Sequence, residues 1–150
     1  MSKVTSRPLT DEHIALLQEC RDEVASDFGL KTASLTPEQI QQWIMETIYK
    51  LQQSTEDIDT KLSRSFALAI VWGDTLIKTM GWHWLLVQDE DGNEVFGVAS
   101  PNRSHVVPVT AYFSRLVSDP KADNTTLLLY NMIHAGDLTP APADALYLMS

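Results

Sequence analysis

GWHWLLVQDEDGNEVFGVASP, residues 81–101, is the most informative stretch of this sequence. Apolar residues follow a period of two on both sides of Asp91-Gly92. That period is typical of β-strands, and Asp-Gly is a strong signal for a hairpin turn. The stretch therefore predicts two antiparallel strands, 82–88 and 94–100.

The two faces of this predicted hairpin are both apolar. A turn on Asp91-Gly92 pairs Trp84 with Ala99, and Leu86 with Gly97. One face then carries Trp82, Trp84, Leu86, Val95, Gly97 and Ala99. The other carries His83, Leu85, Val87, Phe96 and Val98. An antiparallel sheet with one face in water would alternate apolar with polar residues. Either helices of the chain cover both faces, or one face contacts a partner. The candidate interface is Trp82, Trp84, Leu86 and Val95.

The segments around the hairpin have the 3.6-residue apolar period of helices. Thr36-Pro37-Glu38-Gln39 combines an N-cap, a proline in the first turn and a capping-box glutamine. Helices are predicted at about 10–28, 37–51, 56–80, 111–118 and 125–134, with a third strand at 104–109. The order gives an α+β fold: three helices, a three-stranded antiparallel meander, then two shorter helices. We expect a single domain over 1–136 and an irregular C-terminal tail over 137–150.

Composition excludes several classes of function. The chain carries 11 Lys and Arg against 20 Asp and Glu, a net charge of -9, so phosphate backbones are repelled and nucleic-acid binding is not expected. The first residues have no apolar core of a signal peptide, and no apolar run could span a membrane, so we expect a cytoplasmic protein. Cys20 is the single cysteine, which excludes an intrachain disulfide and a thiolate zinc cluster. No metal or cofactor is predicted.

The acidic run 89–94 does not have the spacing of a calcium-binding EF-hand loop. Such a loop needs glycine at its sixth position and glutamate at its twelfth. Counted from Asp89, Gly92 is fourth and Ser100 is twelfth. The run is interpreted as a solvated turn.

Candidate chemistry is sparse, because the chain has none of the common catalytic motifs. Asp74 lies inside the third predicted helix, and Ser100 follows the second strand. His83 lies near the start of the first strand, and His105 could lie one strand away from it. These four residues would form a small-ligand or hydrolase-like site only if at least three of them converge.

The run from Phe66 to Ile133 resembles a family of small bacterial proteins catalogued only as a domain of unknown function. The resemblance rests on the pair Gly73-Asp74 in an apolar helix, on Gly81-Trp82 and Trp84 at a strand start, on the acidic turn, and on Pro108 before the next helix. It implies a bacterial α+β protein and supplies no activity or catalytic residue.

The sequence as a whole favours a non-enzymatic, cytosolic binding protein that self-associates as a homodimer or contacts another protein. Its acidity suggests an inhibitor-like or immunity-like protein that neutralises a basic partner. The alternative is a small-ligand-binding or hydrolase-like enzyme built on His83, Ser100, His105 and Asp74.

Overall fold

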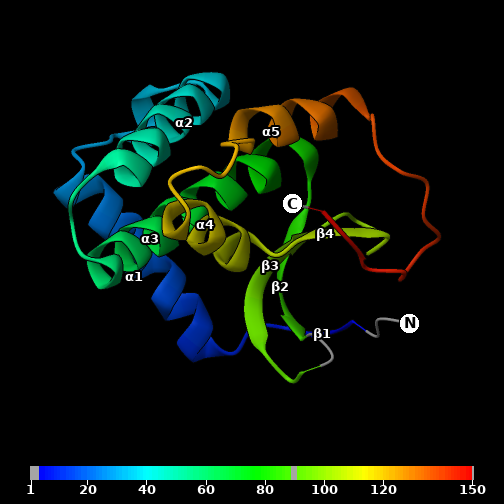
Figure 1. Ribbon diagram of the computed structural model, residues 1–150. Coiled ribbons are helices and arrows are strands. Elements are labelled where there is room, and N and C mark those ends of the chain that lie inside the picture. The colour runs from blue at the N-terminus through cyan, green and yellow to red at the C-terminus, as the bar shows by residue number, and fades with distance from the viewer. Residues whose placement is uncertain (1–3, 89–90, 150) are drawn as a thin grey trace.

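The computed structural model describes residues 4–88 and 91–149 (Figure 1). Within these ranges the α-helices are α1 Asp11–Asp27, α2 Pro37–Gln53, α3 Ile58–Met80, α4 Val109–Ser118 and α5 Thr126–Ala135. Thr36 and Gln39 form the predicted capping box of α2. Gly81 and Gly136 end α3 and α5 in the left-handed conformation that glycine adopts without strain. These three signals were therefore interpreted correctly, whereas α4 begins at Val109, two residues before its predicted start.

The strands form one sheet of five in the order β1-β2-β3-β4-β5, within the described residues. They are β1 Thr5–Arg7, β2 His83–Gln88, β3 Glu94–Ala99, β4 His105–Val107 and β5 Tyr147–Leu148. The α+β class is confirmed, and β2, β3 and β4 form the predicted antiparallel meander. The sheet is nevertheless larger than predicted and mixed, because β1 joins one edge and β5 joins the other in parallel. Both added strands are too short and too exposed to show an apolar alternation.

The predicted register of the hairpin was wrong by one residue. Trp84 pairs with Val98, Leu86 with Phe96, and Gln88 with Glu94. Five residues thus link the closing pair, whereas a turn centred on Asp91-Gly92 requires an even number. A shift of one residue exchanges the faces of one strand relative to the other. Asp89 and Glu90, the first two residues of the acidic run that was interpreted as a solvated turn, lie outside the described residues.

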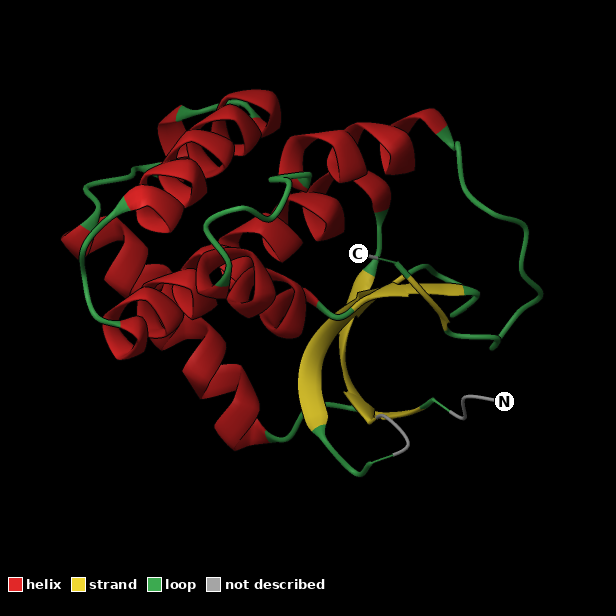
Figure 2. Ribbon diagram, viewed as in Figure 1, coloured by secondary structure: helices red, strands yellow, loops and turns green. Residues whose placement is uncertain are grey.

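The corrected register separates two apolar layers. Trp84, Leu86, Phe96 and Val98 face the helices and belong to the main core. Leu85, Val87, Ala99 and Val106 face the inside of the curl of the sheet, where Leu146 from the C-terminal segment covers them. Figure 2 shows the helices on the outer side of this curl. Both faces are covered by this chain.

The C-terminal segment crosses from α5 to the edge of the sheet (Figure 1). Backbone hydrogen bonds join Leu146 to Arg103 and Tyr147 to Ser104. The Arg103 guanidinium donates to Asp144 at 2.7 Å. The segment predicted to be an irregular tail is therefore partly strand and is fastened to the β3–β4 turn.

Candidate functional site

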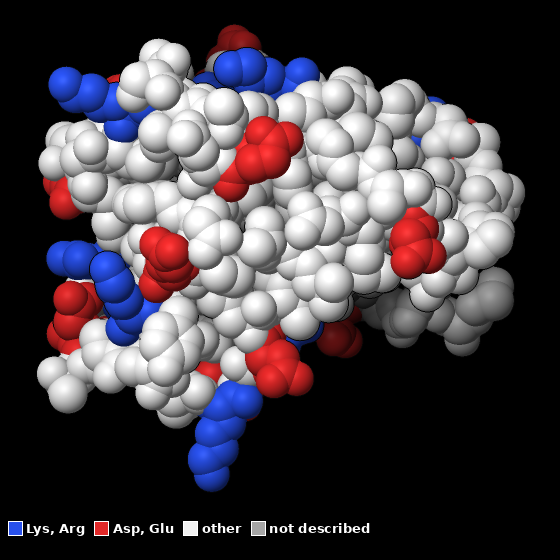
Figure 3. Space-filling model, turned by 90° about the horizontal axis from the view of Figure 1, so that it is seen from above, with Lys and Arg blue, Asp and Glu red and all other residues white. Residues whose placement is uncertain are grey.

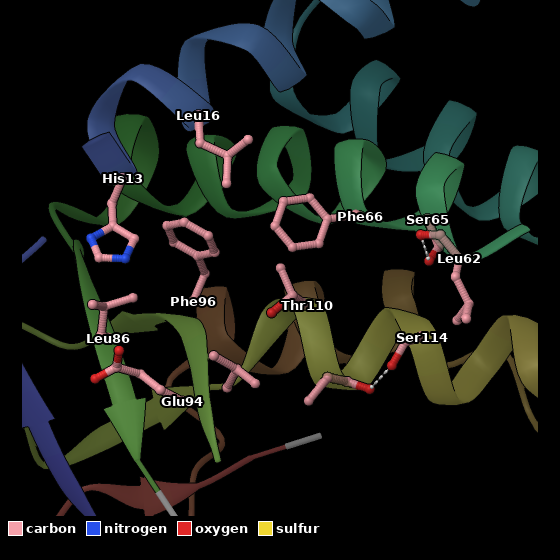
Figure 4. Close-up of a pocket in the computed structure, with 12 residues that line it drawn as sticks. His13, Leu16, Leu62, Ser65, Phe66, Leu86, Glu94, Phe96, Thr110 and Ser114 are labelled. Carbon is pink, nitrogen blue, oxygen red and sulfur yellow. Dashed lines mark hydrogen bonds between the residues drawn. The ribbon is translucent and has the colours of Figure 1, made fainter. Parts of the chain in front are cut away.

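A hollow of about 640 Å³ opens between α1, α3, α4 and the β2–β3 hairpin. Figure 4 shows Leu16 entering from α1 and Thr110 from α4 on opposite sides, with Phe66 and Phe96 between them. A second hollow of about 460 Å³ adjoins it and shares Leu16, Leu62 and Phe66. We call the two together the α1–α3 groove.

The floor of the α1–α3 groove is aromatic. The rings of Phe66 and Phe96 meet edge to face, with centroids 5.7 Å apart. Trp84 contacts the other side of Phe96 in the same manner, at 6.3 Å. Such edge-to-face pairs are favoured by the charge distribution of the rings. The floor is therefore a preformed apolar surface rather than a space that opens on binding.

His13 is held over this floor by the start of α1. The Thr10 side chain accepts from the His13 backbone N–H at 3.4 Å, and the Thr10 backbone N–H donates to His13 Nδ1 at 3.1 Å. The ring proton accordingly lies on Nε2. The imidazole then meets Phe96 edge to face at 5.6 Å. His13 thus serves as a cap and as part of the groove wall.

The mouth of the groove near β3 carries an ion pair. Arg7 donates to the two carboxylate oxygens of Glu94 at 2.6 and 2.7 Å. These hydrogen bonds, together with the charge of Arg7, hold the pKa of Glu94 below its ordinary value. The positive charge of Arg7 therefore already balances the negative charge of Glu94.

The Ser65 and Ser114 hydroxyls and the Cys20 thiol of the groove are not activated for nucleophilic attack. Ser65 and Ser114 donate to carbonyls of their own helices, Leu62 O at 2.9 Å and Ala111 O at 3.0 Å. Burial, reinforced by Glu23 and Glu19, raises the pKa of the Cys20 thiol to about 11. A nucleophile needs an adjacent base or a lowered pKa. Neither the two serine hydroxyls nor the thiol meets this requirement.

Of the four residues of the hydrolase-like alternative, the structure brings Ser100 and His105 together. The His105 backbone N–H donates to Ser100 Oγ at 3.1 Å. Ser104 Oγ lies 3.1 Å from Ser100 Oγ and 2.7 Å from His105 Nδ1. His105 Nε2 donates to the carbonyl of Thr139 at 2.6 Å. All three side chains are buried, and the chain of bonds fastens the C-terminal segment to the turn.

Asp74 and His83 lie elsewhere. Asp74 accepts from Arg21 at 2.7 and 2.9 Å and from the Trp84 indole N–H at 3.2 Å, so it joins α1, α3 and β2. His83 lines a separate hollow with Arg103. Burial is the main cause that lowers the pKa of His83, and the positive charge of Arg103 lowers it further. No three of these four residues therefore converge.

The candidate interface residues are also distributed differently from the prediction. Trp82 and Leu86 are only 5% and 3% exposed and belong to the main core. Trp84 packs against the same core, while Val95 contacts the smaller apolar layer inside the curl. The face that carries three of these residues is covered by helices of this chain.

Leu86 and Val95 of the candidate interface line the groove, but its other residues were not recognised from the sequence. Phe66, Thr110 and Ser114 come from helices whose mutual placement no local pattern indicates. His13 had a usable signal, because Thr10-x-x-His13 has the spacing of a capping box with histidine in place of glutamate or glutamine.

Among the described residues, no cluster of His, Cys, Asp and Glu could hold a metal ion. No helix in that part of the chain could cross a bilayer.

These features define an α+β protein with a curled sheet and an apolar groove beside it. A family model, Domain of unknown function (DUF3806), matches residues 44–126, which is more than half of the 150 residues. The chain belongs to this family, and the resemblance seen in its sequence is confirmed. The match includes α3, the β2–β4 meander and α4, whereas α1 lies outside it. No curated protein and no solved structure matches the chain.

Proposed function

We propose that this is a non-enzymatic, cytoplasmic binding protein, and that the α1–α3 groove receives apolar side chains of a polypeptide partner. The observation that carries the proposal is the apolar hollow between α1 and α4, in which a half-buried Phe66 meets the buried ring of Phe96 edge to face. Apolar depressions with a polar border are typical of protein interaction sites. The hydroxyls bonded to their own helices and the protonated thiol support binding over catalysis. The free, buried Cys20 fits a reducing compartment.

Filling the groove is expected to abolish partner binding. Ser114 lines the groove, and Ser118 lies about one turn further along α4 on the exposed surface; both donate to carbonyls of α4. Peptides selected from a random display library on the wild-type protein should bind Ser118→Trp normally and Ser114→Trp at least about tenfold more weakly, because an indole would occupy the space of the partner. Binding is measured by fluorescence anisotropy. Selected peptides that bind both variants equally, or a library that yields no binders, would contradict the proposal.

We also propose self-association, through a surface formed by α5 and β5. Leu128, Tyr147 and Leu148 are 57%, 45% and 44% exposed. They border a hollow of about 510 Å³ between α5 and the C-terminal segment. α5 carries no Asp, Glu, Lys or Arg. Figure 3 looks onto α2 and α5 and shows a broad uncharged area interrupted by isolated carboxylates. Two copies with a net charge of -9 repel each other, and an uncharged surface minimises that repulsion.

Leu128→Glu is expected to lower the dimer fraction at least about tenfold, because it would bury a carboxylate without a partner in the interface. Ile58→Glu, at a similarly exposed apolar residue at the start of α3, should leave the dimer unchanged. Size-exclusion chromatography with light scattering gives the mass of each variant. A wild-type protein that remains monomeric at high concentration would rule out self-association.

A further inference from the structure

The α1 wall of the groove is acidic as well as apolar. Glu19 and Glu23 stand one turn apart on α1 and line the second hollow, beside the shared residues Leu16 and Phe66. α1 as a whole carries six carboxylates against one arginine. Carboxylates therefore border the groove at the end away from Glu94.

These two carboxylates are available to a ligand. Neither the Glu19 nor the Glu23 carboxylate forms a hydrogen bond or ion pair with another described residue; the Ser26 hydroxyl donates to the backbone carbonyl of Glu23, not to its side chain. The charge of Arg64 acts on Glu23, but its guanidinium lies 3.7 Å from Glu56 and over the Phe28 ring, 5.7 Å from the centroid. Burial, and then the charge of Asp27, raises the pKa of Glu23. A cation placed beside Glu23 would oppose both effects, because it favours the charged carboxylate and so lowers the pKa of Glu23.

The two ends of the groove thus differ in what they offer. At the β3 end, Glu94 is neutralised by two hydrogen bonds from Arg7. At the other end, the Glu19 and Glu23 carboxylates have no such ion-pair partner among the described residues and lie next to the apolar floor. An occupant that satisfies both features must combine apolar side chains with positive charge on one side.

We infer that the groove binds a basic amphipathic segment of another protein, with its apolar side chains over Phe66 and Phe96 and its lysines or arginines against Glu19 and Glu23. This inference rests on the proposed function and adds the class of partner. A second copy of this chain is a poorer occupant, since its net charge of -9 would be opposed by the acidic wall.

Three labelled peptides test the inference. All three have leucine at the same positions, and they differ in carrying lysine, glutamine or glutamate at every other position. At low ionic strength, wild-type protein should bind the leucine–lysine peptide about tenfold more tightly than the leucine–glutamine peptide in fluorescence anisotropy. The leucine–glutamate peptide should bind most weakly. Ser114→Trp should bind the lysine peptide at least about tenfold more weakly than wild type, because binding requires the groove as well as charge.

Charge-neutral variants separate the groove from the general acidity of the protein. Glu19→Gln with Glu23→Gln should weaken lysine-peptide binding about fivefold. Glu38→Gln with Glu46→Gln removes the same charge from α2, outside the groove, and should change affinity less than about twofold. Equal affinity for the lysine and glutamine peptides, or equal weakening by the two double variants, would overturn the basic-partner inference while leaving the proposed function intact. Failure of all three peptides to bind would overturn both.

Discussion

A chain ending at Gly136 is expected to be less stable than the full chain by about 4 kcal/mol. Leu146 and Met149 lie in the removed segment and are only 8% and 9% exposed. Burial of each such side chain contributes about 1.5–3 kcal/mol. The truncation also removes β5 and leaves Leu85 and Val87 without their cover inside the curl. Urea unfolding followed by tryptophan fluorescence measures the loss.

Substitutions in the full chain separate side-chain burial from chain length. Leu146→Ala with Met149→Ala should reproduce most of the destabilisation, whereas Leu148→Ala, at a residue 44% exposed, should cost less than about 0.5 kcal/mol. If the truncated chain unfolds at the same urea concentration as the full chain, the C-terminal segment is not part of the folded core.

Gly73→Ala is expected to destabilise the protein by about 2 kcal/mol, although alanine inside a helix is ordinarily about 1 kcal/mol better than glycine. A Cβ on residue 73 would lie 2.5 Å from Cη2 and 2.8 Å from Cζ2 of Trp84, and 2.8 Å from a methyl of Val98. Nothing short of moving the indole, or α3 away from the sheet, relieves these contacts. Thermal and urea denaturation would give the change in free energy of unfolding.

A double-mutant cycle tests whether the contact with Trp84 causes the loss of stability in Gly73→Ala. In a Trp84→Leu background the indole is absent, so the same Gly73→Ala change should cost at least about 1 kcal/mol less than in the wild type. A stabilising effect of Gly73→Ala in the wild type would show that α3 and β2 are not in close contact. The cycle also explains the Gly73-Asp74 pair. Glycine admits the ring of Trp84, and the neighbouring carboxylate accepts its indole N–H.

Local signals were sufficient to predict the helices. Thr36 to Gln39 contains within four residues the capping interactions that start α2, and the left-handed glycines that end α3 and α5 follow their last apolar residues directly. The α+β class and the central meander followed from the change in apolar period after Gly81. These features depend on interactions between residues close in sequence.

Features that depend on contacts between residues distant in sequence could not be predicted. The hairpin register is set by a five-residue link that Asp91-Gly92 did not reveal. β1 and β5 are strands only because β2 and β4 offer free edges to them. The groove exists because α1, α3 and α4 surround Phe96, and no pattern within one helix specifies that arrangement. The hydrolase-like alternative likewise required at least three of Asp74, His83, Ser100 and His105 to converge. Only the tertiary structure could show that Asp74 and His83 lie away from the other two.

The central claim is that the α1–α3 groove is the binding site of this protein. Titration of ¹⁵N-labelled protein with the leucine–lysine peptide, followed by heteronuclear NMR, tests it most directly. Binding in the groove is expected to give the largest amide shift changes at Leu16, Phe66, Phe96 and Ser114, and little change at Leu128 and Leu148. Shifts centred on α5 and β5, or no shifts at peptide concentrations that saturate the anisotropy signal, would contradict it.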